Sequence, residues 1–394
     1  MNKELMSQAS DESTREPASI FCLGDTWFPH FPGGLDRYVY ELTAALVAGS
    51  DRVELMGVDL PEGVSEESVK RLNIGASDAP LPKRLWQART QFSQRQLGTL
   101  DALNFHFAVY SFALLGQLPK RVPLTFTFHG PWALESDWEG NNKLGIVVKR
   151  WIERQVYRRC DRFIVLSKAF GQILHEGYDV PWSKIHVIPG GVNVENFQPT
   201  LTQSQARAQL GWPEDKFILF TPRRLVNRMG LDKLLSALVE VKQQRPDVLL
   251  AIAGKGPLRE ALEAQTADLG LAEHVLFLGF LPEVDLPAAY QAADLTVIPS
   301  QSLEGFGLIL LESLACGTPA LCTPVGGMPE VLSSFSPQLI TDSAKTEAIA
   351  QKLLAVATGQ IGLPNRSACR TYAVDNFDWA VIAQKVRRVL LSPI

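Results

Sequence analysis

Short runs of β-branched and aromatic residues alternate with longer stretches of helical periodicity over most of the chain. Leu35, Val39, Leu42 and Leu46 recur at the spacing of one helix face, which predicts a helix in this stretch. Alternation of strand and helix favours parallel sheets with helices on both faces, because parallel strands need a crossover connection between them. The predicted strands of the first half are 18–24, 53–60, 103–109, 124–130, 162–167 and 185–191.

The same pattern restarts after residues 187–200, a segment with Gly, Asn and Pro that we interpret as a linker. The predicted strands of the second half are 217–224, 248–256, 275–281, 295–300 and 319–327. A chain of 394 residues exceeds the roughly 250–300 residues over which one hydrophobic core can grow. We therefore expect two α/β domains, over 18–190 and 195–375, and a last helix over 376–394 that crosses back to the first domain.

Composition and charge exclude several classes of protein. A net charge of −4 gives the whole molecule no attraction to nucleic acid. Five cysteines, an odd number without a C-x-x-C spacing, argue against a disulfide framework or a structural zinc and favour a reducing compartment. Residues 1–17 are polar, which predicts a disordered leader rather than a signal peptide, and no stretch approaches the ~20 apolar residues that span a bilayer. We expect a cytoplasmic protein without a nucleic-acid partner.

The most informative segment is 299–321, where a predicted strand ends and a turn with two glycines opens a helix. Gly305 and Gly307 have no side chains, which suits a backbone that must approach a neighbouring group closely. The N–H groups that follow are the anion-binding donors of a helix start. Glu304 stands just before this helix, and Glu312 lies about two turns into it. We expect the helix start to bind a diphosphate and the carboxylates to bind the sugar-like hydroxyls on either side.

Other interpretations of these residues remain open. Two carboxylates also fit the acid and base of a glycosidase, although a glycine-rich helix start between them favours a phosphate over a water. Glu304 by itself also fits a favourable charge at a helix N-terminus. Residues 253–258, AGKGPL, contain a G-x-G spacing but no third glycine, which gives little support to a dinucleotide-binding dehydrogenase.

EGFGLILLE, from Glu304 to Glu312, resembles the signature of glycosyltransferase family 4, a family of retaining enzymes with the GT-B fold. Other segments resemble the same family in the same order along the chain: FPGGLDRYVYEL, FTFHGPW, RCDRFIVLSKAFGQIL with IHVIPGGVNVENFQP, TPRRLVNRMGLDKLL with LAIAGKGPLREALE, VLFLGFLPEVDLPAAYQAADLTVIPS and GTPALCTPVGGMPEVL. The resemblance implies two Rossmann-like domains with parallel sheets facing across a cleft. The first would be on the acceptor side, and the second would bind a nucleotide-sugar donor.

The resemblance also implies roles for individual residues. Glu304 would hold the donor sugar's hydroxyls at the reacting face, and Glu312 would bind the ribose hydroxyls. His129 would contact the donor sugar near the anomeric carbon, although taken alone it fits equally well a histidine satisfied by neighbouring strand ends. The backbone near Phe280 and Leu281 would contact the base. The remaining predicted donor-binding positions use backbone N–H groups or the absence of a side chain, and are Gly33, Gly34, Gly254, Gly305, Phe306, Gly307 and Leu308.

One departure from the family pattern concerns the diphosphate. The pattern G-R-L-x-x-x-K-G begins here at Arg223, so that Arg224 matches its arginine while Met229 stands at the lysine position. Arg228, one residue away, would supply the missing charge, because a guanidinium can grip phosphate oxygens bidentately. The alternative is that Arg228 is a solvated surface residue. No D-x-D pair occurs in the sequence, and cationic side chains can stabilise a leaving diphosphate, so we expect neither a metal nor a cofactor.

Donor and acceptor follow from the family alone. Its common donors favour UDP-glucose, with GDP-mannose and UDP-GlcNAc behind it. The acceptor would be a saccharide or lipid-linked saccharide in cell-surface polysaccharide synthesis, and residues 76–96, with Trp86, either line its site or only pack. The alternatives are a UDP-sugar 2-epimerase on the same architecture and a non-catalytic nucleotide-sugar binder.

A basic helix is predicted over residues 143–160. Its cations lie around Trp151 and are Lys149, Arg150, Arg154, Arg158 and Arg159. The segment fits a solvated helix face, which we favour, or a weak peripheral contact with the inner face of the plasma membrane.

Overall fold

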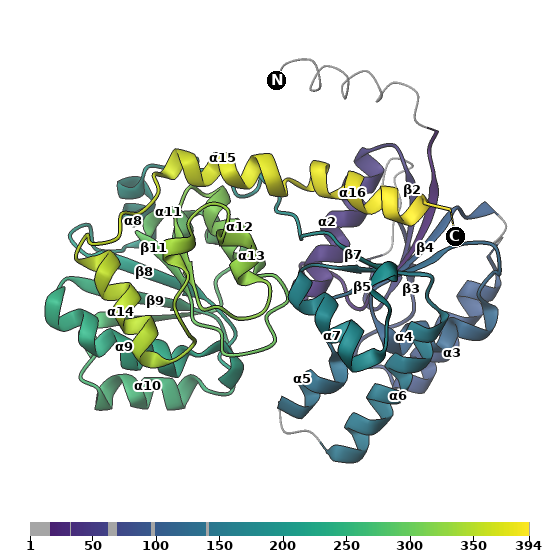
Figure 1. Cartoon of the computed structure of the whole chain (residues 1–394), viewed down its shortest axis with the longest axis horizontal. Coiled ribbons are helices and arrows are strands. Elements are labelled where there is room, and N and C mark those ends of the chain that lie inside the picture. Colours follow the sequence, from purple (N-terminus) through teal and green to yellow (C-terminus); the bar gives the residue numbers. More distant parts are fainter. Residues whose placement is uncertain (1–15, 32, 62–68, 96–98, 139–141, 394) are drawn as a thin grey trace. The chain divides into compact units, whose positions relative to one another are not determined.

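A computed structural model describes residues 16–31, 33–61, 69–95, 99–138 and 142–393 (Figure 1). The predicted disordered leader therefore lies outside the described residues, apart from its last two positions. Within these described residues the strands form one sheet of seven, in the order β3-β2-β1-β4-β5-β6-β7, and one of five, in the order β10-β9-β8-β11-β12. Paired strands in both sheets run parallel, for example β1 with β2 and β8 with β9. The two predicted α/β patterns thus form two separate sheets.

The first sheet contains every strand predicted for the first half and one that was not predicted. Its strands are β1 Ser19–Leu23, β2 Arg52–Gly57, β3 Lys70–Asn73, β4 Ala102–Phe105, β5 Leu124–Phe128, β6 Arg162–Val165 and β7 Ile185–Val187. Strand β3 escaped prediction because it is a short, charged edge strand, KRLN, without an apolar run. The strand predicted over 103–109 was too long, since a helix already begins at Ala108.

The second sheet contains the five strands predicted for the second half. They are β8 Phe217–Pro222, β9 Val248–Ala253, β10 Val275–Gly279, β11 Leu295–Ile298 and β12 Ala320–Cys322. All six residues of β9 are buried, as a continuous apolar run in a parallel sheet predicts.

Helices connect most of the strands. They are α2 Gly34–Ala48, α3 Leu81–Ser93, α4 Ala108–Leu114, α5 Trp132–Trp138, α6 Lys143–Arg159, α7 Lys168–Tyr178, α8 Gln203–Leu210, α9 Leu231–Gln244, α10 Arg259–Asp268, α11 Leu286–Ala292, α12 Leu308–Ala315, α13 Met328–Leu332, α14 Thr346–Ala357, α15 Arg366–Phe377 and α16 Trp379–Leu391. The single helix predicted over 376–394 is wrong at its start. Asp378 is extended, with φ −59° and ψ 137°, and separates α15 from α16.

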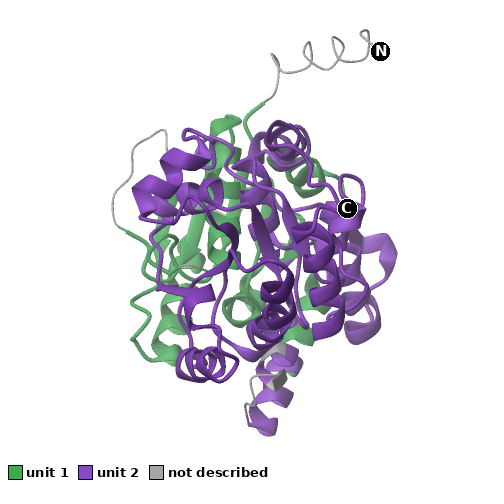
Figure 2. Ribbon diagram, turned by 90° about the vertical axis from the view of Figure 1, so that its left-hand side faces the viewer, with its two compact units in different colours: residues 1–127, 151–163, 383–394 green, residues 128–150, 164–382 purple. Residues whose placement is uncertain are grey.

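The chain divides into two compact units, coloured separately in Figure 2. Unit 1 comprises residues 1–127, 151–163 and 383–394, and unit 2 comprises residues 128–150 and 164–382. Unit 2 therefore also takes in part of the stretch that the sequence assigns to an N-terminal domain.

The C-terminal part of α16 belongs to unit 1. There Arg387 Nε lies 2.7 Å from the carboxylate of Asp51, and Arg162 donates a hydrogen bond to the carbonyl of Val389 at 2.9 Å. All five cysteines are buried and free. Among the described residues we find no helix with both the length and the apolar character needed to cross a membrane.

The topology of unit 2 gathers polar residues at one edge of the five-stranded sheet. Because parallel strands all end at the same edge, residues that follow β8, β9, β11 and β12 lie close together there. The backbone N–H of Arg223 donates to the carbonyl of Ala253 at 2.8 Å, and the hydroxyl of Thr323 donates to the carbonyl of Ser300 at 2.6 Å. This edge carries the candidate site.

Candidate functional site

An ion pair between a buried arginine and a half-buried glutamate lies at the carboxyl edge of the five-stranded sheet. Arg223 directly follows β8, and its Nη2 donates to the carboxylate of Glu304 and to the hydroxyl of Ser300. The Ser300 hydroxyl in turn donates to Glu304 at 3.1 Å. The side chains of Arg223 and Glu304 are 6% and 14% exposed. The ends of two strands therefore hold one carboxylate in a fixed position.

The surroundings of Glu304 keep it ionised. Burial alone would raise its pKa, but the charge and hydrogen bond of Arg223, the charge of Arg228 and the Ser300 hydroxyl together hold the pKa below its usual value. The carboxylate can therefore accept hydrogen bonds from hydroxyl groups at neutral pH but has no proton to donate. A glycosidase acid needs a raised pKa, so Glu304 does not fit the acid of a glycosidase pair.

The loop that carries Glu304 is fixed through its carbonyl groups. Arg228 Nη1 donates to the carbonyl of Leu303 at 3.2 Å, and the N–H of Gly327 donates to the carbonyl of Glu304 at 3.1 Å. Ser167, the N-cap of α7, donates to the carbonyl of Gly305 at 2.7 Å. Leu303 has a φ of 49°, a conformation that a leucine adopts only when its surroundings impose it. The loop is therefore held in one arrangement before α12 begins.

The structure explains why the loop has a glycine at each of two positions. A Cβ on Gly305 would lie 2.9 Å from the Phe170 ring of α7, so the close neighbour of this glycine is the protein itself. Gly307 is the N-cap of α12 and has a φ of 85°, which favours glycine. No side chain caps the first turn of α12, where the carbonyl of Gly307 accepts the backbone N–H of Leu310 at 2.9 Å.

The other predicted residues of this segment lie in or next to α12, and two of them are buried. Glu312 is buried, and its Oε2 accepts a hydrogen bond from the Tyr290 hydroxyl at 2.7 Å. Phe306 is buried, with its ring centroid 5.9 Å from that of Phe377. Leu308 is the first residue of α12. The structure thus places Glu304 and Glu312 in one segment with different partners, and the ribose role of Glu312 stays a prediction.

The arginines of the 223–230 segment differ in their surroundings. Arg224 is exposed, while Arg228 is half-buried and reaches the carbonyl of Leu303. Met229 is buried and brings no charge. Sequence reasoning selected Arg224 from the family pattern and missed Arg223. The available signal was its place at the end of a buried strand, where successive side chains point to opposite faces.

Four further predicted residues follow strands and belong to unit 2. His129 follows β5, and burial lowers its pKa to about 3, so the imidazole is neutral at physiological pH. Gly254 follows β9 and donates its N–H to the carbonyl of Gly279 at 2.6 Å. Phe280 and Leu281 follow β10, and the Phe280 ring is 52% exposed. His129 and Gly254 lie at strand ends, as predicted, whereas Phe280 and Leu281 follow a strand that was predicted to include them.

Gly33 and Gly34 open α2 in unit 1, where Gly33 is the N-cap. A Cβ on Gly33 would lie 2.7 Å from the carboxylate of Asp36, which itself accepts the backbone N–H of Thr26 at 2.9 Å. Asp25 follows β1 nearby, and burial, with the charge of Asp36, raises its pKa to about 7 although Arg84 opposes the shift. Sequence reasoning missed Asp25, because an isolated aspartate after a strand gives no signal.

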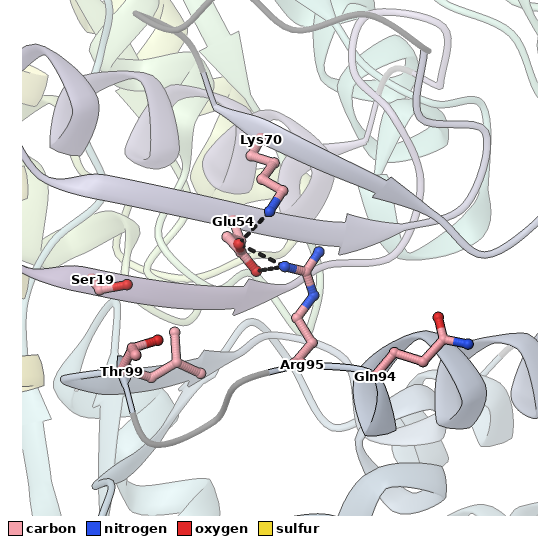
Figure 3. A pocket seen from close by; sticks show the side chains of 7 residues that line it. Ser19, Glu54, Lys70, Gln94, Arg95 and Thr99 are labelled. Atoms are coloured by element: carbon pink, nitrogen blue, oxygen red, sulfur yellow. Dashed lines mark hydrogen bonds and ion pairs between the residues drawn. The ribbon is translucent and has the colours of Figure 1, made fainter.

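A pocket of about 300 Å³ in unit 1 has a different character (Figure 3). Ser19 and Lys70 begin β1 and β3, so the pocket lies at the amino edge of these parallel strands, opposite the edge where α/β proteins bind ligands. Glu54 accepts hydrogen bonds from Lys70 at 2.8 Å and from Arg95 at 2.6 Å. The charged side chains that line the pocket are paired with one another, and we assign the pocket no role. Within the described ranges, no cluster of three or more His, Cys, Asp or Glu side chains is arranged to hold a metal ion.

Two parallel sheets in two α/β units define the GT-B fold, and solved structures of glycosyltransferases share it. Sucrose-phosphate synthase from Thermosynechococcus elongatus superimposes with a TM-score of 0.75 at 22% identity, covering 94% of this chain and 98% of that one. HepE of Anabaena, in complex with UDP and glucose, gives a TM-score of 0.73 at 20% identity, covering 95% and 99%.

Sequence comparison defines the family. The profile described as glycosyl transferases group 1 matches residues 202–392, and that of glycosyltransferase family 4 matches residues 32–196. An uncharacterised glycosyltransferase of Methanocaldococcus jannaschii is 32% identical over 322 residues, which are 77% of this chain and 80% of the relative. A GDP-mannose-dependent alpha-(1-6)-phosphatidylinositol monomannoside mannosyltransferase of Mycolicibacterium smegmatis is 28% identical over 384 residues, 92% and 96% of the two chains. This chain belongs to the group 1, family 4 glycosyltransferases, as its sequence motifs predict.

Proposed function

We propose that this enzyme transfers a hexose, with retention of the anomeric configuration, from a nucleoside diphosphate sugar to a hydroxyl group of a saccharide or lipid-linked acceptor. The observation that carries the proposal is the half-buried Glu304 carboxylate, kept ionised by Arg223 directly before the start of α12. An ionised carboxylate accepts hydrogen bonds from sugar hydroxyls, and a helix start without a capping side chain suits a diphosphate. Glu304 directly precedes this helix start along the chain, which suits a donor whose sugar is joined to a diphosphate.

The surroundings of Glu304 favour an orienting role over a nucleophilic one. Its carboxylate already accepts hydrogen bonds from Arg223 and Ser300, which lowers its reactivity toward an anomeric carbon. We therefore propose front-side attack, in which the acceptor oxygen bonds to the anomeric carbon as the bond to the diphosphate breaks. The leaving phosphate oxygen takes the acceptor's proton. Arg224 and Arg228 would stabilise the diphosphate charge. Isolation of a covalent glycosyl adduct on Glu304 would contradict this mechanism.

Two donors have support from relatives. The mannosyltransferase of Mycolicibacterium smegmatis is GDP-mannose-dependent, and a phosphatidyl-myo-inositol mannosyltransferase of Mycobacterium leprae is 28% identical over 91% of this chain. HepE of Anabaena has been solved with UDP-glucose, at 20% identity. GDP-mannose therefore stands beside UDP-glucose, the donor that the sequence favours, as a candidate for this enzyme.

A cluster in unit 1, formed by Asp25, Asp36, Arg84 and Tyr110, supports an acceptor with a phosphate group. Arg84 Nη1 donates to the Tyr110 hydroxyl at 2.7 Å, while its Nε is buried without a hydrogen-bond partner in the described part of the chain. Arg84 thus brings a positive charge and an unused donor to the cluster, and Asp25 offers a carboxyl group for a hydroxyl. Names of relatives include phosphatidylinositol and inositol 3-phosphate acceptors. We propose an acceptor in which a phosphate lies next to the reacting hydroxyl.

The exposed surface of helix α6 supports a peripheral contact of the enzyme with the inner, cytoplasmic face of a membrane. Leu144, Val147, Val148 and Trp151 recur at the spacing of one helix face and are 72%, 64%, 49% and 51% exposed. The exposed cations of the helix are Lys143, Arg150, Arg154 and Arg158. An exposed apolar face flanked by cations suits anionic lipid better than water, so we now favour membrane contact over the solvated face.

Release of free nucleotide from a panel of nucleotide sugars tests the proposed function. The panel contains UDP-glucose, GDP-mannose and UDP-GlcNAc, each with EDTA and then with magnesium. Phosphatidylinositol, inositol phosphate and a neutral disaccharide serve as acceptors. We expect slow, EDTA-resistant hydrolysis of one donor, accelerated by one of the phosphate-bearing acceptors.

Three other outcomes contradict parts of the proposal. Release of an epimerised free sugar without any acceptor would indicate the 2-epimerase alternative. Tight donor binding without turnover, with every acceptor present, would indicate a non-catalytic binder. Failure to bind any nucleotide sugar would contradict the proposed function as a whole.

A further inference from the structure

The backbone of Arg223 is fixed on both sides at the end of β8. Its N–H donates to the carbonyl of Ala253 at 2.8 Å, and its carbonyl lies against Gly254, which leaves no room there for a Cβ. Gly254 has a φ of 144°, so this close approach depends on glycine. Because both neighbours of the strand end are set, the direction in which the Arg223 side chain leaves the backbone is also set.

The guanidinium of Arg223 is aimed at protein groups rather than at solvent. It donates to Glu304 and Ser300, and the carbonyl of Ser300 accepts the hydroxyl of Thr323 at 2.6 Å. With the side chain of Arg223 only 6% exposed, its charge is matched by the Glu304 carboxylate. A cation neutralised in this way attracts a diphosphate less than the exposed guanidinium of Arg224 does.

We propose that Arg223 is a positioning residue for Glu304, which holds the carboxylate ionised and aimed at the hydroxyls of the donor sugar. The proposal rests on the proposed function of Glu304 and divides the arginines of one segment by role. Arg223 acts on the sugar end of the donor through Glu304, whereas Arg224 and Arg228 act on the diphosphate. Loss of Arg223 therefore changes kcat and its pH dependence more than it changes donor affinity.

The test compares Arg223→Gln and Arg223→Lys with a matched control in the same unit. Arg207 forms another ion pair there, with its Nη2 2.8 Å from the carboxylate of Asp294 and its own side chain 6% exposed. Arg207→Gln therefore removes a buried cation of similar exposure that has no place in the candidate site. For every variant the unfolding midpoint, the donor Kd and the pH profile of kcat are measured.

We expect Arg223→Gln to lower kcat at neutral pH by at least tenfold, and to move the acid limb of the profile upward by about one to three pH units. The donor Kd changes by less than threefold. Arg223→Lys recovers most of kcat, because an ammonium restores the positive charge. Arg207→Gln lowers the unfolding midpoint but keeps the acid limb of the wild type. An unshifted acid limb in Arg223→Gln, or the same losses in Arg207→Gln, would overturn the proposal.

A second measurement does not depend on turnover. The side-chain carboxyl carbon of Glu304 is followed by NMR against pH in glutamate-labelled protein, with the signal assigned from Glu304→Gln. We expect the pKa of Glu304 to lie below the usual range of glutamate in the wild type. In Arg223→Gln we expect this pKa to be higher than in the wild type. Equal titration in both proteins would overturn the proposal. A shifted titration in a protein that turns over no nucleotide sugar would instead refute the proposed function and leave the role of Arg223 toward Glu304 intact.

Discussion

Glu304 and Glu312 stand in one segment, yet their surroundings give them different chemistry. Glu304 faces the guanidinium of Arg223, while Glu312 is buried against the hydroxyl of Tyr290. The sequence placed both carboxylates around the helix start, because that depends only on local spacing. It did not reveal their partners, because Arg223 and Tyr290 reach them through strand pairing and helix packing.

The same reason explains the choice between the adjacent arginines. A motif pointed to Arg224, and only the direction of the strand end decides which of the two side chains turns inward. Glu304, the loop glycines and the strand-end positions of His129 and Gly254 were therefore predictable, and the buried partner of Glu304 was not.

His129 leads to a prediction about acid stability. Its pKa is about 3 in the folded protein and about 6.5 when unfolded, so the unfolded chain takes up the proton first as the pH falls. The folded state therefore loses stability from about pH 6.5 downward, by about 2 kcal/mol at pH 5 from this residue. His129→Asn should lose less stability between pH 7 and pH 5 than the wild type in urea unfolding.

Equal losses in the two proteins would show that His129 is not buried in its neutral form. Glu304 does not confound the comparison, because its pKa is lowered and its contribution is lost only below the usual range of a glutamate.

At the scale of elements, helix α7 holds the loop in front of α12. Ser167 caps α7 and also donates to the carbonyl of Gly305, while Phe170 fills the space beside that glycine. The sequence predicted both the loop and the glycines, but it suggested a ligand as the close neighbour. It did not predict β3 or the break at Asp378, because the first lacks an apolar run and the second interrupts a continuous helical pattern.

Gly305→Ala tests the packing of α7 against this loop. The new Cβ would lie 2.9 Å from the Phe170 ring, and we expect a loss of about 1–3 kcal/mol in the free energy of unfolding. The double variant with Phe170→Leu should lose less than the sum of the two single variants, since the smaller side chain makes room. Gly177→Ala in α7, where no atom lies within 4 Å of the new Cβ, is the control. Strict additivity in the cycle would contradict the proposed contact.

At the scale of the whole molecule, the repeated strand and helix pattern was sufficient to predict two α/β sheets. The bounds of the compact units were less accessible, because residues 128–150 and 383–394 group with parts of the chain that are distant in sequence. From the sequence, a solvated helix face was the favoured interpretation of α6. The exposure of its apolar face is a property of the folded chain.

Membrane contact through α6 is tested by co-sedimentation with vesicles. We expect binding to vesicles that contain phosphatidylglycerol at low salt and little binding to neutral phosphatidylcholine vesicles. Val147→Asp should reduce the bound fraction several-fold, because a charge then replaces an apolar side chain that is 64% exposed. Val284→Asp alters a valine that is 81% exposed outside α6 and should bind as the wild type does. Equal binding of both variants would contradict the membrane role of α6.

The central claim is that the ionised Glu304 carboxylate orients the donor sugar for transfer. Its most direct test is the steady-state rate of transfer by Glu304→Gln, with the donor and acceptor that the wild type uses. Glu263→Gln, which changes a surface carboxylate paired with Arg259, is the control. The account predicts a kcat lower by about 100-fold or more in Glu304→Gln, with an unchanged circular dichroism spectrum and a control like the wild type. A Glu304→Gln enzyme with a kcat close to that of the wild type would contradict it.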